Sequence, residues 1–247
     1  MTSQAGPPRI ETVADIAYQL DETQAWAFER DRAGEIEAHW QKRLARNPHL
    51  FDGRVLLMRQ AEIIERDGAR RLQGTCFSAA YKSFMAWRDF GFPESGVANV
   101  FGMAALRSAD GAFLLGEMAS TTANAGDIYF PAGTPDPKDL KDGSIDFEGS
   151  VLRELKEETG LGQDSVRLDA GWTIVFYGAY IACMKAMRSS LSAAEILARV
   201  DGFLAREKHP ELARLKPVVS PADFDQDHMP EFTRAYMRHV WERVEPN

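Results

Sequence analysis

The sequence predicts a mixed α/β fold, and three observations support this prediction. Apolar runs of strand length recur along the chain, for example at residues 97–107 and 112–118. Other segments repeat apolar residues at the spacing of amphipathic helices, for example at residues 193–207. The two patterns do not alternate regularly, which favours a mixed sheet with helices on its faces over repeated βαβ units.

The first part of the chain is predicted to contain two helices and two strands. Residues 21–46 are predicted as one helix that ends before Pro48, because the residue preceding a proline is disfavoured in the helical conformation. Residues 54–58 and 71–80 have the composition of strands. A second helix is predicted from the apolar stripe Tyr81, Phe84, Trp87 and Phe90, and it ends at Gly91 and Pro93.

The second part contains more strands and the most distinctive helix. The apolar runs at 97–107 and 112–118 are predicted to pair through a hairpin at 108–111, since Asp110-Gly111 favours a tight turn. A helix is predicted at 146–159, with Asp146 or Ser144 as its N-cap and Gly160 just past its end. The remaining predictions are a strand at 128–130, one or two strands within 166–184, and helices at 193–207 and 230–244.

A candidate boundary separates these two parts. Pro93-Glu94-Ser95-Gly96 combines residues that punctuate regular structure. We therefore predict two domains, a smaller N-terminal α/β module at 1–95 and a larger domain at 96–247.

The composition argues against several classes of partner. The 247 residues include 29 basic and 37 acidic ones, for a formal charge of −8. Non-specific binding to nucleic acid or to an anionic membrane requires clustered Lys and Arg, so neither partner is expected. An anionic small molecule held through a bound cation remains compatible with this charge.

The cysteines and the N-terminus indicate a reducing compartment. Cys76 and Cys183 are too few for a disulfide framework, and each lies in an apolar run, so we predict that both are buried and reduced. The N-terminal segment lacks a basic region followed by an apolar one, which a secretory signal requires. We expect a cytoplasmic protein.

The segment Arg153-Glu154-Leu155-Lys156-Glu157-Glu158-Thr159-Gly160-Leu161 is the most informative in the chain. On a helix, Glu154 and Glu158 lie one turn apart on one face, and Glu157 lies beside both. Three neighbouring carboxylates repel one another unless a positive charge lies among them. Mg²⁺ meets that need, because it prefers oxygen ligands and keeps waters that a phosphate can replace. An ordinary solvated charged face is the alternative.

This segment resembles the second half of the Nudix hydrolase motif, G-x5-E-x7-R-E-U-x-E-E-x-G-U, in which U is apolar. The first half differs. If Gly133 is the motif glycine, the loop before Arg153 is about six residues longer than in the family. The early glutamate position then falls on Ile145, so that carboxylate is missing or is replaced by Asp146 or Glu148.

The resemblance implies an α/β/α sandwich that hydrolyses a nucleoside diphosphate linked to another group, with Mg²⁺ or Mn²⁺ as cofactor. It implies Glu154, Glu157 and Glu158 as metal ligands, together with the carbonyl of Gly133. Arg153 would orient the glutamates, and Arg153, Glu154 and Glu157 are the predicted catalytic residues. The proton acceptor stays open between Glu154, Glu157 and an acid within residues 223–231.

A finer resemblance extends into the N-terminal part. The phrases Asn47-Pro48-His49-Leu50-Phe51-Asp52-Gly53, Tyr81-Lys82-Ser83-Phe84 and Ser150-Val151-Leu152 are similar to the UDP-glucose diphosphatase type of the family, which also has an N-terminal module. This implies cleavage of a UDP-sugar to UMP and sugar 1-phosphate by a monomer or homodimer. ADP-ribose and coenzyme A remain alternative substrates, and a Nudix-fold nucleotide-binding module without catalysis remains an alternative function.

Several other side chains are open to two interpretations. Aromatic residues of the predicted strands can stack on a nucleobase, but they more often belong to a core. His228 lies beside Asp225 and Asp227, as a general base can, although exposed loop histidines usually have no such role. The aromatic residues in question are Trp172, Phe176, Tyr177 and Tyr180 on strands, and Tyr81, Phe84 and Trp87 on the second predicted helix.

Overall fold

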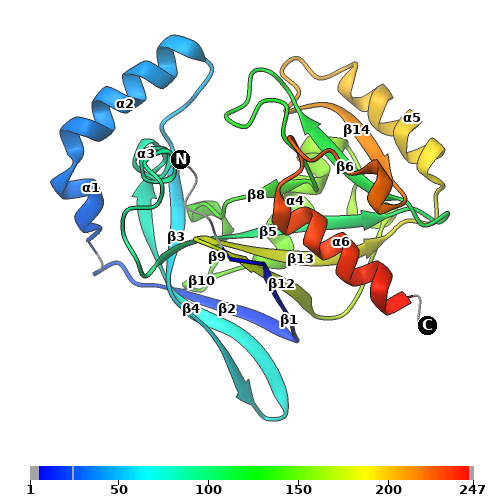
Figure 1. Ribbon diagram of the computed structural model, residues 1–247, viewed down its shortest axis with the longest axis horizontal. Coiled ribbons are helices and arrows are strands. Elements are labelled where there is room, and N and C mark those ends of the chain that lie inside the picture. Colours follow the sequence, from blue (N-terminus) through cyan, green and yellow to red (C-terminus); the bar gives the residue numbers. More distant parts are fainter. Residues whose placement is uncertain (1–5, 24, 245–247) are drawn as a thin grey trace.

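The computed structural model describes residues 6–23 and 25–244, and the strands of these residues belong to one mixed sheet (Figure 1). The N-terminal strands are β1 (Arg9–Val13), β2 (Asp15–Leu20), β3 (Arg54–Arg66) and β4 (Ala69–Ala80). The others are β5 (Val97–Arg107), β6 (Phe113–Met118), β7 (Ile128–Tyr129), β8 (Ala132–Gly133), β9 (Leu140–Lys141), β10 (Ser144–Ile145), β11 (Arg167–Leu168), β12 (Trp172–Tyr177), β13 (Tyr180–Arg188) and β14 (Leu212–Val218). The main path runs β1-β12-β13-β5-β3-β4-β2-β10-β9.

Six α-helices accompany the sheet within the described residues. They are α1 (Ala27–Asp31), α2 (Ala33–Arg46), α3 (Tyr81–Asp89), α4 (Phe147–Thr159), α5 (Ala193–Leu204) and α6 (Glu231–Val244). The pairings β13 with β5 and β2 with β4 are parallel, whereas the pairs β12–β13 and β3–β4 are antiparallel. The predicted mixed α/β fold class is therefore confirmed.

Strand β5 shows how the layers are arranged. Its side chains alternate between two cores, because successive residues of a strand point to opposite faces. One core also contains Val151 and Leu155 of α4 and Ile196 of α5, and the other contains Tyr236 of α6. The sheet is thus covered on both faces, with α6 in front of it and α4 behind in Figure 1. Val100, Ala104 and Leu106 face the first core, and Phe101, Met103 and Ala105 face the second.

The N-terminal part has a core of its own and also shares one with the rest of the chain. Helices α1 to α3 cover Leu57 of β3 and Phe77 of β4. The neighbouring residues Leu56 and Met58 belong to the same core as α4. Strand β1 also pairs with β12, from Arg9 opposite Phe176 to Val13 opposite Trp172. Sheet and core are continuous across residue 95, and the division into domains 1–95 and 96–247 stays a prediction.

One predicted helix is wrong. Residues 21–46 do not form a single helix, because Arg32 leaves the helical conformation between α1 and α2, with φ −114° and ψ 22°. Its guanidinium instead lies over the rings of Phe28 and Phe90 and pairs with Glu35. The backbone N–H of Asp21 instead donates to the Cys76 carbonyl, which continues the pairing of β2 with β4. The predicted end before Pro48 is confirmed.

The other predicted elements are present, with some additions. The hairpin β3–β4 extends beyond both predicted strands, and the loop after β8 contains the short pair β9–β10. Strands β1, β2 and β14 were not predicted. Cys76 and Cys183 are buried and free, as predicted. In the described part of the chain, no helix is both long and apolar enough to cross a membrane.

Candidate active site

Helix α4 carries the glutamate cluster, and its ends are formed as predicted. Asp146 caps the N-terminus by accepting a hydrogen bond of 2.9 Å from the Gly149 N–H. Gly160 ends the helix with φ +72°, a conformation that favours glycine. Val151 and Leu155 face the core, so Glu154, Glu157 and Glu158 emerge on other sides of the helix.

The backbone of β8 lies directly against two of these glutamates. The N–H of Ala132 donates to Glu158 Oε1 over 3.3 Å. A Cβ atom at Gly133 would lie 2.3 Å from Glu154 Oε1, so no larger residue fits there without movement of that carboxylate. The structure therefore brings the β8 segment with Gly133 together with Glu154 and Glu158.

Arg153 joins the cluster to an acid that the sequence did not identify. Its Nη2 donates to both carboxylate oxygens of Asp139, over 2.9 and 3.2 Å. Its Nη1 lies 2.9 Å from Glu154 Oε1 and 3.1 Å from Glu157 Oε2. The side chain of Asp139 is 4% exposed. Arg153 thus holds Glu154 and Glu157 from one side and is anchored by Asp139 from the other.

Of the alternatives for the early glutamate, neither Asp146 nor Glu148 contacts Arg153. Asp146 caps α4 and pairs with Lys141. Glu148 pairs with Lys185 at 2.7 Å. Ile145 is buried, at 5% exposure, and belongs to the core. Asp139 is the acidic partner of Arg153 instead, because the longer loop turns back toward the helix.

Burial and crowding shift the protonation of this cluster. Burial raises the pKa of Glu154 to about 7. The positive charge of Arg153 opposes this shift, and the negative charge of Glu157 adds to it. Burial and the charges of Glu154 and Glu211 raise the pKa of Glu158 well above its ordinary value. Burial and the charge of Glu157 also raise the pKa of Glu211. Glu211 comes from the segment just before β14, and its charge contributes to the raised pKa values of Glu154 and Glu158.

One observation indicates that the oxygen donors of this cluster fit a hard divalent cation. Glu158 Oε2 is buried and has no hydrogen-bond partner, which is costly for a carboxylate. Glu154, Glu158, Glu157 and the Gly133 carbonyl would hold the ion, and oxygen ligands of this kind suit Mg²⁺ or Mn²⁺. In the described residues no three such side chains converge as metal ligands, and Arg153 contacts Glu154 and Glu157 instead.

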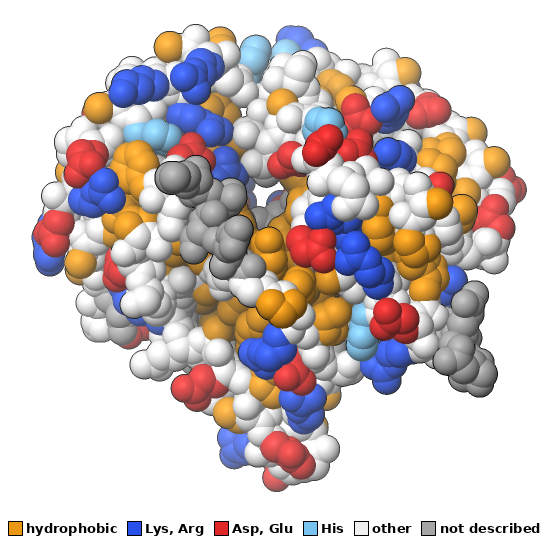
Figure 2. Space-filling view, in the orientation of Figure 1, with side chains coloured by type: hydrophobic (Ala, Val, Ile, Leu, Met, Phe, Trp, Pro, Cys, Tyr) orange, Lys and Arg blue, Asp and Glu red, His pale blue; other side chains and the backbone are white. Residues whose placement is uncertain are grey.

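A cavity of about 1240 Å³ borders the cluster at Gly133 and Glu211. It opens as a hollow at the centre of the face shown in Figure 2. One wall comes from α3 and the segment that follows it, and the opposite wall comes from residues 122–127 and the start of α6. Strand β5 and the β12–β13 turn complete the lining. The cavity thus lies between the N-terminal and C-terminal parts of the chain.

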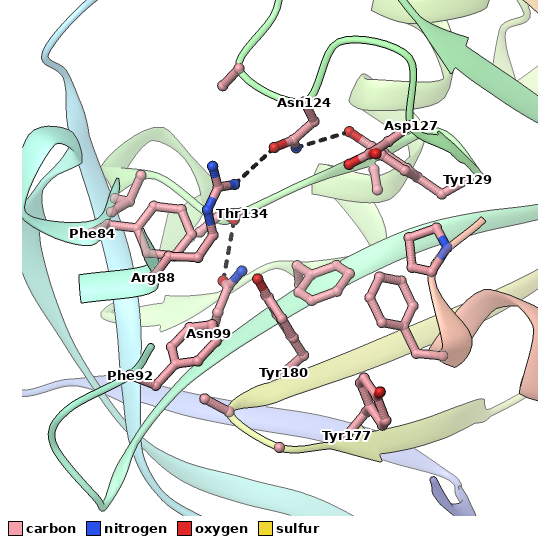
Figure 3. Close-up of a pocket in the computed structure, with 18 of the residues that line it drawn as sticks. Phe84, Arg88, Phe92, Asn99, Asn124, Asp127, Tyr129, Thr134, Tyr177 and Tyr180 are labelled. Carbon is pink, nitrogen blue, oxygen red and sulfur yellow. Dashed lines mark hydrogen bonds between the residues drawn. The ribbon is translucent and has the colours of Figure 1, made fainter. Parts of the chain in front are cut away.

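Aromatic rings form one wall of this cavity (Figure 3). The Phe92 and Tyr180 rings are 5.1 Å apart in an edge-to-face arrangement, and Tyr180 lies 5.9 Å from Phe232. Phe92 has φ +59°, which is rare for a bulky residue, and its backbone N–H donates to the Trp87 carbonyl at the end of α3. Tyr177 also lines the cavity, whereas Trp172 is a core residue. Of the predicted helix stripe, Tyr81 and Phe84 line the cavity and Trp87 is buried.

The acids proposed in residues 223–231 lie apart from the cluster or are already paired. Glu231 lines the cavity but contacts Arg234 and Arg238, each at 2.8 Å. The His228 ring contacts Asp225 at 3.1 Å. The negative charge of Glu157 contributes to the raised pKa of Glu211, so Glu211 interacts electrostatically with one of the predicted catalytic residues.

The sequence did not identify Asp139, Glu211, Arg88, Phe92 or Asn99 as site residues. The extra loop length was a signal for Asp139, but the loop has several acids and no periodicity to choose among them. The other four are distant in sequence from the motif, and only the tertiary structure brings them to one cavity.

The fold of this chain is similar to solved structures of Nudix proteins, at low sequence identity. No family model matches the sequence, and no curated protein sequence matches it. A Nudix hydrolase from M. smegmatis is 16% identical with a TM-score of 0.38, over 60% of this chain and 87% of that one. The MutT protein from Methanosarcina mazei Go1 is 18% identical with a TM-score of 0.42, over 60% and 96%. A C. elegans Ap4A hydrolase is 14% identical with a TM-score of 0.35, over 57% and 98%.

Proposed function

We propose that this protein is a Nudix-type hydrolase that uses Mg²⁺ to cleave the diphosphate of a nucleoside diphosphate linked to another group. One observation carries the proposal: the buried, unpartnered oxygen of Glu158 lies in a crowded carboxylate cluster beside a large cavity. A purely structural helix has no need of such a costly group. A site that binds a cation together with a phosphate does need it.

Each residue of the cluster has a distinct task in this chemistry. Glu154 and Glu158 would hold the cation, with Glu157 and the Gly133 carbonyl as further ligands. A bound Mg²⁺ neutralises phosphate oxygens and lowers the pKa of a coordinated water. Arg153, anchored by Asp139, orients Glu154 and Glu157. Partners of this kind are needed because ligands that are free to rotate bind metal less well.

A carboxylate near the cation accepts the proton of the attacking water. The candidates are Glu154 and Glu157, which pair with Arg153, and Glu211, whose pKa is raised in part by the charge of Glu157. Replacement of each by Gln separates them, since loss of the base lowers kcat and removes the corresponding limb of the pH–rate profile.

We infer that a UDP-sugar is the substrate, cleaved to UMP and sugar 1-phosphate. The sequence similarity of the N-terminal phrases to the UDP-glucose diphosphatase type supports this substrate, and the cavity volume is sufficient for a nucleotide sugar. ADP-ribose and coenzyme A are the alternative substrates. The protein would act in the cytoplasm as a monomer or homodimer, without nucleic-acid or membrane partners.

Product analysis tests the proposal. Purified protein is incubated with UDP-glucose, UDP-galactose, ADP-ribose, ADP-glucose, NADH and coenzyme A, each with Mg²⁺ and with EDTA. We expect Mg²⁺-dependent UMP and sugar 1-phosphate from the UDP-sugars. Cleavage of other members alone contradicts the UDP-sugar assignment, and silence across the panel contradicts hydrolysis of this substrate class.

A second candidate function is a nucleotide-binding module without catalysis. It is favoured by one departure from the motif, the burial of Ile145 in the core where the family has a glutamate. Under this alternative, UDP-glucose raises the melting temperature of the protein without being consumed. Turnover that Glu158→Gln abolishes would exclude it.

A further inference from the structure

The cavity is lined by acids and by one cation among the described residues. The cation is Arg88, and the acids are Asp89, Glu94, Asp127, Glu211 and Glu231. Three of these acids are already paired with cations outside the lining: Asp89 with Arg43, Glu94 with Arg59 and Glu231 with Arg234. The position of Arg88 therefore matters for any anionic ligand.

Arg88 reaches the cavity from α3, in the N-terminal part of the chain. Its Nη1 donates to Asn124 Oδ1 over 2.8 Å, and Asn124 Nδ2 donates to the Tyr129 hydroxyl over 3.2 Å (Figure 3). Burial, and to a smaller extent the charge of Glu158, raises the pKa of Tyr129. A line of hydrogen bonds thus runs from Arg88 through Asn124 to Tyr129.

The charge of Arg88 is only weakly engaged by its acidic neighbour. Asp89 Oδ2 lies 2.9 Å from both Arg43 Nη1 and His39 Nε2. Arg88 Nε contacts the other oxygen, Oδ1, at the longer distance of 3.3 Å. A guanidinium has five N–H donors. Within the described residues, Arg88 uses one of them for a hydrogen bond to Asp89 and another for a hydrogen bond to Asn124. Donors therefore remain for a ligand.

We propose that Arg88 binds a phosphate group of the nucleotide substrate, so that the N-terminal part of the chain forms part of the substrate site. This inference rests on the proposed function and adds a specificity residue to it. A guanidinium pairs with two phosphate oxygens at once, which a single amide cannot do. The aromatic wall of Phe92 and Tyr180 lies in the same cavity and offers a face for the base.

Calorimetric titration without turnover tests the assignment. The probes are two pairs of ligands titrated separately, UMP and uridine, and AMP and adenosine. Within each pair, the difference in binding free energy between nucleotide and nucleoside measures the contribution of the phosphate. We expect wild type to bind the nucleotide of one pair more tightly than its nucleoside. Arg88→Gln should weaken that nucleotide about ten- to hundredfold, as loss of a charged hydrogen bond does, and leave the nucleoside unchanged. Arg88→Lys should recover part of the loss.

Arg43→Gln is the matched control. Arg43 contacts the same Asp89 and donates to the carbonyl of Ala123 over 3.3 Å, but it does not line the cavity. A role limited to holding the 122–127 segment would make both variants alike. Equal losses in the two variants, or a nucleotide preference that persists in Arg88→Gln, overturn the assignment.

Kinetics separate this inference from the proposed function. If wild type hydrolyses UDP-glucose, Arg88→Gln should raise KM more than it lowers kcat, and a change in kcat alone would contradict phosphate binding. If wild type hydrolyses nothing in the panel while Arg88→Gln still removes the nucleotide preference, the hydrolase proposal fails and the Arg88 assignment is supported.

Discussion

The two ends of the candidate site are assembled in different ways. At one end, Glu154, Glu157 and Glu158 lie within one helical turn of α4 and beside β8. At the other end, Arg88, Asn124 and Tyr180 come from three distant segments that meet around the cavity. Local sequence therefore encodes the proposed metal cluster, whereas the proposed recognition end depends on how the whole chain folds. Changes at the two ends should have separable effects on kcat and on substrate affinity.

The largest effect is expected at the chemical end. Glu158→Gln removes a proposed metal ligand but preserves the volume of the side chain. Turnover should fall by more than about 100-fold, since the loss of an indirect metal partner alone costs about 10- to 100-fold. The measurement is kcat at saturating Mg²⁺, with circular dichroism to verify the fold. Glu207→Gln, at an exposed position after α5, is the control and should retain wild-type activity.

The next prediction concerns the anchor of the cluster. Asp139→Asn keeps the shape of the side chain and removes the charge that Arg153 contacts, so Arg153 should hold Glu154 and Glu157 less precisely. We expect kcat to fall by about 10- to 100-fold, with little change in KM. Asp142→Asn, an exposed change in the same loop, controls for general loop effects. A rise in KM alone would show that Asp139 belongs to the recognition end.

A smaller effect is expected at the recognition end. Phe92→Leu keeps an apolar side chain but removes the flat ring that faces Tyr180. Because stacking of a base on an aromatic ring is worth roughly 1–3 kcal/mol, KM should rise by about tenfold with kcat preserved. Phe90→Leu changes a ring outside the cavity, between Phe28 and His39, and should leave KM unaltered. If both variants retain wild-type KM, the aromatic wall does not bind the base.

The smallest effect is on stability rather than activity. Asp146→Ala removes the N-cap of α4 and should lower the free energy of unfolding by about 1 kcal/mol at neutral pH. Burial raises the pKa of Asp146, but the contacts with Lys141 and the Gly149 N–H outweigh it and hold this pKa below its ordinary value of 3.8. The stabilisation is therefore complete above pH 3.8 and is lost as the pH falls through the lower folded-state pKa. Urea unfolding of both proteins at neutral and acidic pH should show the difference shrink in acid; a constant difference would contradict a charged cap.

Features that depend on nearby residues were predictable. Helix α4 follows from Asp146 at its start, Gly160 at its end and the apolar positions between them. The same holds for the β5–β6 hairpin, because its turn residues lie between the two strands that they join.

Features that depend on long-range contacts were not predictable. Asp139 closes a 3₁₀ turn with Asp136 and also reaches Arg153, and both contacts depend on the path of an unusually long loop. The rare backbone conformation of Phe92 is maintained by its packing against Trp87 and Tyr180. The predicted helix at 21–46 failed for a similar reason, since one of the rings beneath Arg32 is that of Phe90, just past the end of α3.

The most direct test of the central claim is parallel product analysis of three proteins on UDP-glucose and ADP-ribose with Mg²⁺. Wild type should split the diphosphate of at least one substrate into two phosphate-bearing products. Glu158→Gln should give no detectable product at any substrate concentration, whereas Arg88→Gln should approach wild-type rates only at high substrate concentration. Wild-type behaviour of both variants, or release of products without metal, would contradict the claim that this cluster and cavity form one active site.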